Sequence, residues 1–96
     1  MRPSIALERH RAAIRQAVIR HRAVNVRVFG AALTGQDSDD SDLDLLVDPL
    51  PGVTLFDLGG LQIELEEMMG IPVEVLTPGD LPAKFRSQVL AEAQPV

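Results

Sequence analysis

Two aspartates, Asp42 and Asp44, stand at the start of an apolar run that ends at Val47. Side chains two residues apart on a β-strand lie on the same face, so these carboxylates would lie side by side, with Leu43 and Leu45 buried on the other face. Like charges this close repel each other, and a divalent cation is the usual compensation. Together with a glycine-rich turn upstream, the pair indicates metal-dependent phosphoryl or nucleotidyl transfer.

A glycine-rich turn lies directly upstream of the two aspartates. It begins at Gly30, where another apolar run ends, contains Gly35, and leads through an acidic stretch to Ser41. Backbone N–H groups in such a turn can approach a phosphate closely. The glycines alone are weak evidence, because glycine commonly follows a strand. Ser41 is expected either to brace the loop or to serve as an ordinary turn residue.

Glu74 is a third candidate acid, alone in the apolar segment Pro72–Leu76. If this segment is a strand beside the one that starts at Leu43, Glu74 would face Asp42 and Asp44 in an oxygen-rich site suited to Mg²⁺. Two such ions could neutralise a triphosphate, activate a hydroxyl and stabilise leaving pyrophosphate. Glu74 would merely face solvent if its strand is an isolated edge, and the sequence leaves both arrangements open.

The acidic stretch also has a rival interpretation. The first, third, fifth and twelfth positions of an EF-hand calcium loop would be filled by Asp37, Asp39, Ser41 and Asp48. Asp42 would then occupy the sixth position, where the loop needs glycine, and the flanking segments are predicted strands rather than helices. We therefore interpret Asp37, Asp39 and Asp40 as solvated loop residues without a catalytic role.

The elements that must position these residues follow from hydrophobic periodicity and turn signals. Three helices are predicted. The first covers 4–22, and the second begins at a capping box of Thr54 and Asp57 and ends at a C-cap, Gly70. The third covers 81–93 and follows an Asp80 cap. Strands are predicted over 24–29, 43–47 and 72–76, with one helical turn at 31–34. The predicted order is α-β-loop-β-α-β-α in a single domain, 1–96.

Two of the predicted helices carry apolar faces expected to be buried. The stripe of the central helix consists of Leu55, Leu58, Leu61, Leu65 and Met68. The inner face of the last helix consists of Leu81, Phe85 and Val89.

Charge is distributed unevenly along the chain. Seven of the nine Lys and Arg residues lie at or before Arg27, and from Val28 to Ala83 twelve acids stand without one Lys, Arg or His. Such a body is a poor nonspecific nucleic-acid binder, so no direct nucleic-acid partner is expected. The arginine-rich segment is a solvated helix face, a docking surface for an acidic partner, or the source of one arginine that reaches bound phosphates.

Composition argues against a disulfide-stabilised, membrane-spanning or secreted protein. The chain of 96 residues contains no cysteine and no stretch approaching the roughly 20 apolar residues that span a bilayer. Its start lacks the apolar segment of a signal peptide. A cytoplasmic protein without a membrane partner is therefore the expectation.

The same residues resemble a known family, the minimal nucleotidyltransferases of the DNA polymerase β superfamily, in particular the MntA-like antitoxins. The family pattern is a Gly-Ser turn, a second glycine, and Ser-Asp-x-Asp-Leu-x-Val. Here it appears as Gly30-Ala31, Gly35 and Ser41-Asp42-Leu43-Asp44-Leu45-Leu46-Val47. The similarity continues through residues 55–61, 70–78 and 89–93 and so covers nearly the whole chain.

The resemblance implies an α+β, polymerase β-like nucleotidyltransferase fold, in which helices flank a small mixed β-sheet. It implies ATP as substrate and two Mg²⁺ ions, with Asp42 and Asp44 at the metal-binding positions and Glu74 at the third acidic position, where the family usually has Asp. Gly30, Ala31 and Ser41 would line the nucleotide phosphates. Characterised relatives neutralise a HEPN-domain RNase toxin by moving AMP from ATP onto a tyrosine hydroxyl of the toxin.

Two departures from the pattern bear on activity. Ala31 stands where the family has Ser, and Ala32 stands where a basic residue is common. A charged hydrogen bond is worth about 1.5–3 kcal/mol, so ATP affinity is expected to fall by about one to two orders of magnitude. The expectation is thus a weakened enzyme. The alternative is an inactive module that neutralises the toxin by complex formation, and self-association into a homo-oligomer is left open.

Overall fold

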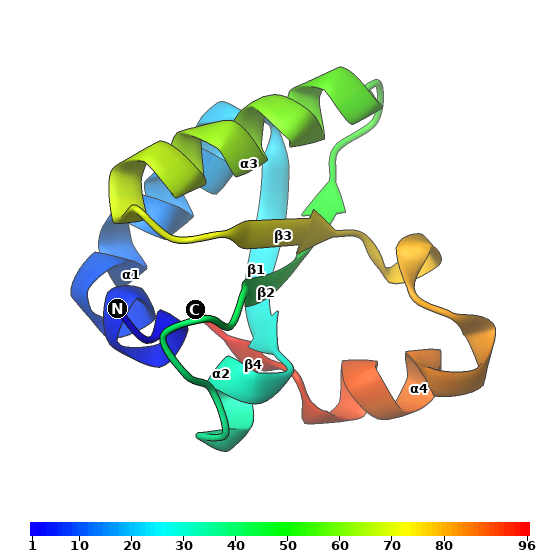
Figure 1. Ribbon diagram of the computed structural model, residues 1–96. Helices are drawn as coiled ribbons and strands as arrows, with labels where there is room; N and C mark the ends of the chain where they lie inside the picture. The colour runs from blue at the N-terminus through cyan, green and yellow to red at the C-terminus, as the bar shows by residue number, and fades with distance from the viewer.

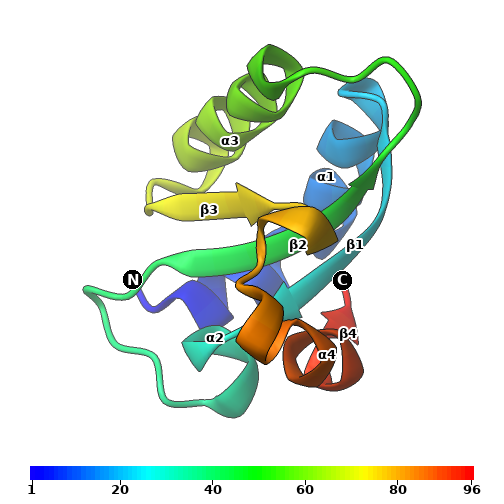
Figure 2. The same cartoon turned by 90° about the vertical axis from the view of Figure 1, so that its right-hand side faces the viewer.

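A four-stranded sheet forms the centre of the computed structural model, which describes residues 1–96. The elements in chain order are α1 (Pro3–Arg20), β1 (Ala23–Phe29), α2 (Ala31–Thr34), β2 (Leu43–Pro49), α3 (Leu55–Met69), β3 (Val73–Leu76), the 3₁₀ turn η1 (Pro78–Asp80), α4 (Ala83–Glu92) and β4 (Gln94–Pro95). Helices α1 and α3 lie together on one side of the sheet, and α4 lies on the other (Figure 1, Figure 2). None of the helices is long and apolar enough to cross a bilayer.

The sheet is mixed, as the family resemblance implies. Its strand order is β3-β2-β1-β4. β1 pairs antiparallel with both β2 and β4, whereas β2 pairs parallel with β3. A parallel pair needs a crossover connection, which α3 supplies. Because of this crossover, β3 lies directly beside the strand that carries Asp44.

The alternation of β2 divides its side chains between the two faces of the sheet. Leu43, Leu45 and Val47 are fully buried and belong to the core beneath α1 and α3. Asp44 and Leu46 therefore point to the opposite face. The helices contribute to the same core chiefly through Ile14, Val18, Leu61 and Leu65. The buried core side chains of β2 thus fix the position of Asp44 on the opposite face.

Several local signals are confirmed. Thr54 and Asp57 form the predicted capping box, with the Thr54 N–H donating to Asp57 Oδ2 at 2.8 Å. Helix α3 ends where Gly70 adopts a left-handed φ of 69°. The single helical turn at Ala31–Thr34 is also present as α2.

The C-terminal part differs from the prediction. The Asp80 carboxylate accepts a hydrogen bond from the Thr77 N–H at 2.9 Å and closes η1, so it caps no long helix. α4 begins only at Ala83, because Pro82 lacks an N–H and restricts the residue before it. Of its predicted inner face, Leu81 is buried, whereas Phe85 is 50% exposed.

Two further differences concern single elements. Leu55, predicted in the buried stripe of α3, is 81% exposed because it lies in the first turn, before the helix reaches the core. The short strand β4 was not predicted, since two residues that include a proline carry no periodic pattern. It pairs with β1 at Arg27 and Val28.

Candidate active site

The parallel pairing of β2 and β3 places Asp44 and Glu74 next to each other. The two residues are register partners, and Phe29 of β1 is the partner of Asp44 on its other side. Partners in neighbouring strands project from the same face of a sheet. Asp44 is half-buried, and Glu74 is exposed. Glu74 is thus adjacent to Asp44 because of the strand register, and it is open to solvent because β3 is an edge strand.

Asp42 lies just before β2, at the end of the loop, and is exposed. The next residue is fixed to β3, because the Leu43 N–H donates to the Pro72 carbonyl at 2.9 Å. Asp42 and Glu74 therefore lie near the same end of the strand pair. The three candidate carboxylates thus lie near one end of the β2–β3 pair.

Asp44 is electrostatically unusual. Its burial, followed by the nearby Glu74 and Asp42 carboxylates, raises the pKa of Asp44 to about 6. Removal of water disfavours the charged form, and two like charges disfavour it again. A perturbed carboxyl of this kind is typical of functional sites.

Gly30 packs directly against Asp44. It has a φ of 75° and a ψ of −152°, and a Cβ atom at this position would collide with Asp44 Oδ2. These dihedral angles lie in a region that glycine alone occupies at low cost. The glycine therefore lets the backbone that opens α2 approach the carboxylate.

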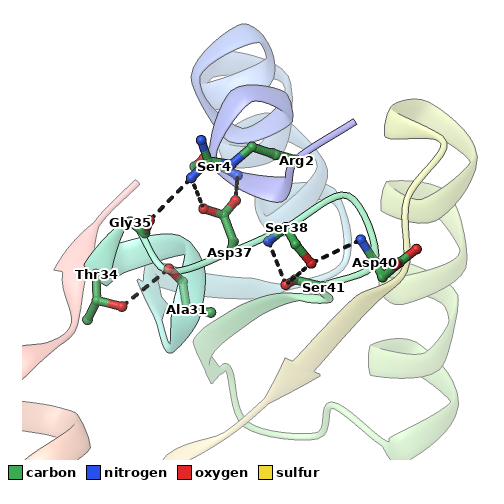
Figure 3. Close-up of polar contacts among 9 residues, drawn as sticks. All are labelled: Arg2, Ser4, Ala31, Thr34, Gly35, Asp37, Ser38, Asp40 and Ser41. Atoms are coloured by element: carbon green, nitrogen blue, oxygen red, sulfur yellow. Dashed lines mark hydrogen bonds and ion pairs between the residues drawn. The ribbon is translucent and has the colours of Figure 1, made fainter.

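The loop between α2 and β2 is organised by its serines (Figure 3). The Ser41 hydroxyl accepts a hydrogen bond from the Ser38 N–H at 2.9 Å, and the Ser41 N–H donates to the Ser38 carbonyl at 3.1 Å. The Asp40 N–H donates to the Ser38 hydroxyl at 3.3 Å. Ser41 thus braces the turn that leads into Asp42.

Asp37 is not a solvated residue, contrary to the prediction. Its side chain is fully buried and accepts hydrogen bonds from Arg2 Nη2 at 2.9 Å and from the Ser4 N–H at 2.8 Å (Figure 3). Asp39 and Asp40 are exposed, as predicted. Because Asp37 is committed to α1, it cannot serve as the first ligand of a calcium loop, and the EF-hand interpretation fails.

Comparison with known proteins identifies the family. Residues 7–96 match the family model described as "Nucleotidyltransferase domain". The chain belongs to the nucleotidyltransferase domain family. This nucleotidyltransferase domain is also 33% identical, over 76 residues, to a Methanocaldococcus jannaschii protein named "Putative protein adenylyltransferase", a match that covers 79% of the chain and 82% of the relative.

Solved structures share the fold of this nucleotidyltransferase domain. One, described as "Structure of putative minimal nucleotidyltransferase", has a TM-score of 0.86 and 41% identity and covers 97% of this chain and 95% of that one. A toxin–antitoxin with AMP-PNP gives a TM-score of 0.67 at 15% identity, over 84% and 70% of the two chains. A mutant of the MntA-HpeT toxin–antitoxin gives 0.72 at 12% identity, over 88% and 69%. The last two show the fold alone.

The three acids predicted to bind Mg²⁺ in this nucleotidyltransferase domain suit that ion in ligand type. Asp42, Asp44 and Glu74 supply only carboxylate oxygens, which hard cations prefer. The structure contains no group of three or more Asp, Glu, His or Cys side chains placed so that they could hold a metal ion. The assignment of the three acids as metal ligands stays a prediction.

A cavity of about 320 Å³ adjoins the start of α2 in this nucleotidyltransferase domain. It is lined by Gly30, Ala31 and Thr34 on one side and by Val89 and Glu92 of α4 on the other. Gly30 and Ala31 are predicted nucleotide-binding residues, so this cavity lies beside the predicted phosphate loop, residues 30–35. A second cavity of the same volume lies between α1 and β1 and includes none of the predicted site residues.

Arg2 contacts the loop beside the candidate site of this nucleotidyltransferase domain, which its sequence context does not predict. Five other arginines of the N-terminal third bind elsewhere: Arg11 to Glu8, Arg15 to the Val96 carbonyl, Arg20 to Glu64, Arg22 to the Pro51 carbonyl and Arg27 to Asp48. Arg2 instead reaches the loop and donates to the Gly35 carbonyl at 3.2 Å. The only local signal for this contact is a basic residue beside Pro3 at the start of α1.

Proposed function

We propose that this chain is a Mg²⁺-dependent antitoxin that transfers AMP from ATP to a tyrosine hydroxyl of a cognate HEPN-type RNase toxin and thereby neutralises it. The observation that carries the proposal is the register pair of Asp44 and Glu74, with Gly30 packed on Asp44. Nucleotidyl transfer is the chemistry of the family. The similarity to a named protein adenylyltransferase supports a protein acceptor, and the toxin–antitoxin structures support a toxin as that acceptor.

Each residue has a distinct part in the proposed reaction. Asp42, Asp44 and Glu74 would hold Mg²⁺, which when bound neutralises triphosphate charge and stabilises leaving pyrophosphate. Backbone N–H groups at Gly30 and Ala31, together with Ser41, would orient the phosphates.

The acceptor oxygen forms a bond to the α-phosphorus while the bond from that phosphorus to the bridging oxygen breaks, and the electron pair leaves with pyrophosphate. Glu74 accepts the proton of the hydroxyl, since it is the exposed carboxylate beside Asp44.

Mass spectrometry of the partner tests the proposal. The chain and its HEPN-type partner are co-expressed, purified, and incubated with ATP and Mg²⁺ beside a D42N/D44N double variant. We expect an AMP adduct on one partner tyrosine, absent with the double variant and with EDTA. An adduct that persists in the double variant contradicts the assigned site.

Complex formation without transfer is the second candidate function. It is favoured by the phosphate loop, in which Ala31 has no hydroxyl and Ala32 is only 8% exposed, and by exposed apolar residues on α3. These are Leu55, Phe56 and Ile63, exposed by 81%, 92% and 57%. A stable complex with no adduct, and neutralisation retained by the double variant, would establish this function instead.

Restoring the missing hydroxyl should strengthen nucleotide binding. Ala31 opens α2, is half-buried, and lines the cavity beside Gly30. In the Ala31→Ser variant, one new hydrogen bond to a phosphate should raise ATP affinity by about 2- to 10-fold. Isothermal titration with Mg²⁺ and AMP-PNP measures this change. Ala12→Ser, on the exposed face of α1, is the control, and equal affinities of both variants would contradict the role of position 31.

A further inference from the structure

Asp37 stands apart from its neighbours in the acidic loop. Its side chain is fully buried, whereas Gln36, Ser38, Asp39 and Asp40 are exposed. A buried carboxylate is retained at low cost only when its oxygens are hydrogen-bonded and its charge is paired. Both conditions are met, because one oxygen accepts from the Ser4 N–H and the other from Arg2.

The two contacts attach the loop to the N-terminus of α1. Arg2, the N-cap residue of α1, makes no side-chain capping hydrogen bond, and the Ser4 N–H instead donates to the Asp37 carboxylate, 33 residues away in the sequence. A helix N-terminus also favours a negative charge. The Ser4 N–H and, to a lesser degree, Arg2 hold the pKa of Asp37 at about 2, so the carboxylate is charged at any working pH.

Arg2 extends the attachment toward the phosphate loop. The same nitrogen, Nη2, donates to Asp37 Oδ1 and to the Gly35 carbonyl, at the end of α2 (Figure 3). From Ser38 to Ser41 the loop is instead braced by its own serines. The other contact of the loop with the N-terminal region is an exposed ion pair of Asp39 with the Met1 ammonium at 3.7 Å. Asp37 is therefore the buried anchor between the Gly30 turn and Asp42.

We propose that Asp37, through Arg2 and the first turn of α1, is a positioning residue that fixes the span from the Gly30 turn to Asp42 and so prepares the chain to bind a nucleoside triphosphate. This inference rests on the proposed function as far as it concerns nucleotide. Asp37 touches no reacting atom. It acts by removing loop conformations in which the phosphate-binding N–H groups and the Asp42 carboxylate are too far apart to hold one ligand.

Hydrogen exchange and nucleotide titration together test the inference. The variants are Asp37→Asn, Asp37→Ala and Arg2→Gln, with Asp39→Asn as the matched control from the exposed part of the loop. In Asp37→Ala we expect loss of amide protection over residues 35–41, unchanged protection in β2 and α3, and about tenfold weaker binding of AMP-PNP with Mg²⁺.

Conservative variants separate positioning from general destabilisation. Asp37→Asn keeps an acceptor for the Ser4 N–H and should lose less affinity than Asp37→Ala. Arg2→Gln should also bind nucleotide more weakly. Combining it with Asp37→Asn should cause little further loss of affinity, because both substitutions remove the same ion pair. In transfer assays, the KM for ATP should rise more than kcat falls.

The outcomes are distinguishable from failure of the proposed function. Loss of loop protection with unchanged AMP-PNP affinity would overturn the inference, as would an equal loss of affinity in Asp39→Asn. A wild-type chain that binds AMP-PNP but modifies no partner contradicts the proposed transfer and leaves the affinity comparison intact. A wild-type chain that binds no nucleotide contradicts both.

Discussion

Replacing Asp44 by Asn should abolish AMP transfer and, at the same time, make the protein more stable. Transfer should fall by at least about 1,000-fold, equivalent to about 4 kcal/mol, because a predicted metal ligand is lost. Stability should rise because burial and the neighbouring Glu74 and Asp42 carboxylates raise the pKa of Asp44 to about 6. Its ionisation at neutral pH therefore opposes folding.

The gain in stability should depend on pH in a defined direction. Asp has an unfolded-state pKa near 3.8, and the folded-state value is about 6, so between these values the folded wild type binds more protons than the unfolded chain. Wild-type stability thus falls as pH rises through this window. With allowance for solvent screening, Asp44→Asn should be more stable by about 1–2 kcal/mol at pH 7.5, and the advantage should vanish near pH 4.

Urea unfolding at the two pH values, with and without Mg²⁺, measures both effects. Asp40→Asn removes one exposed carboxylate from the same loop region and is the control for net charge. Mg²⁺ should stabilise the wild type and leave Asp44→Asn unchanged, since a ligand stabilises only the state that binds it. A variant no more stable than wild type at pH 7.5 would show that the site carries no electrostatic strain.

Replacing Gly30 by Ala should also remove most of the activity, by displacement of Asp44. The new Cβ atom would collide with Asp44 Oδ2, and the backbone at φ 75° and ψ −152° disfavours any L side chain. The strain should cost about 1–3 kcal/mol of stability. The carboxylate can escape the collision only by turning away, so transfer should fall by about 100-fold or more, as expected for a misplaced catalytic group.

Gly35→Ala is the matched control for this prediction. Gly35 also has a positive φ, 76°, but a Cβ atom there would meet nothing within 4 Å. Its substitution should therefore cost about 1 kcal/mol of stability and leave transfer nearly unchanged. Melting curves and initial rates of the two variants distinguish backbone strain from displacement of Asp44. Equal losses of activity would mean that contact with Asp44 is not what position 30 provides.

The positions that spacing could predict are those set by local periodicity. The alternation of β2 separates Leu43 and Leu45 from Asp44, and a crossover helix of the length of α3 brings the next strand alongside in parallel. The first rule is local and the second depends only on chain topology, so the proximity of Glu74 to Asp44 could be predicted from the sequence. The capping box that opens α3 is equally local.

Asp37 could not be placed in this way. Its partners, Arg2 and Ser4, are more than 30 residues distant, and an acid in a polar loop has the same local pattern whether it is solvated or buried. Burial of α4 was mispredicted for a related reason. Leu81, Phe85 and Val89 have helical spacing, but periodicity does not reveal how much sheet surface remains to cover them.

The Asp80 cap failed for a more specific reason. Thr77 and Asp80 repeat the spacing of Thr54 and Asp57 and form the same reciprocal hydrogen bonds. Pro82 follows the second box and interrupts the helix after one 3₁₀ turn. Identical start signals can therefore open a helix of 15 residues or a turn of three.

The placement of charge has a consequence for how fast nucleotide arrives. The site gathers carboxylates in a chain of net charge −5, and Arg27, the nearest basic residue along β1, is already paired with Asp48 at 3.2 Å. A free triphosphate therefore approaches against a repulsive field, which ions screen beyond about 10 Å at 0.1 M salt. Encounter with nucleotide should accelerate as ionic strength rises, opposite to the behaviour of enzymes whose basic clefts attract their substrates.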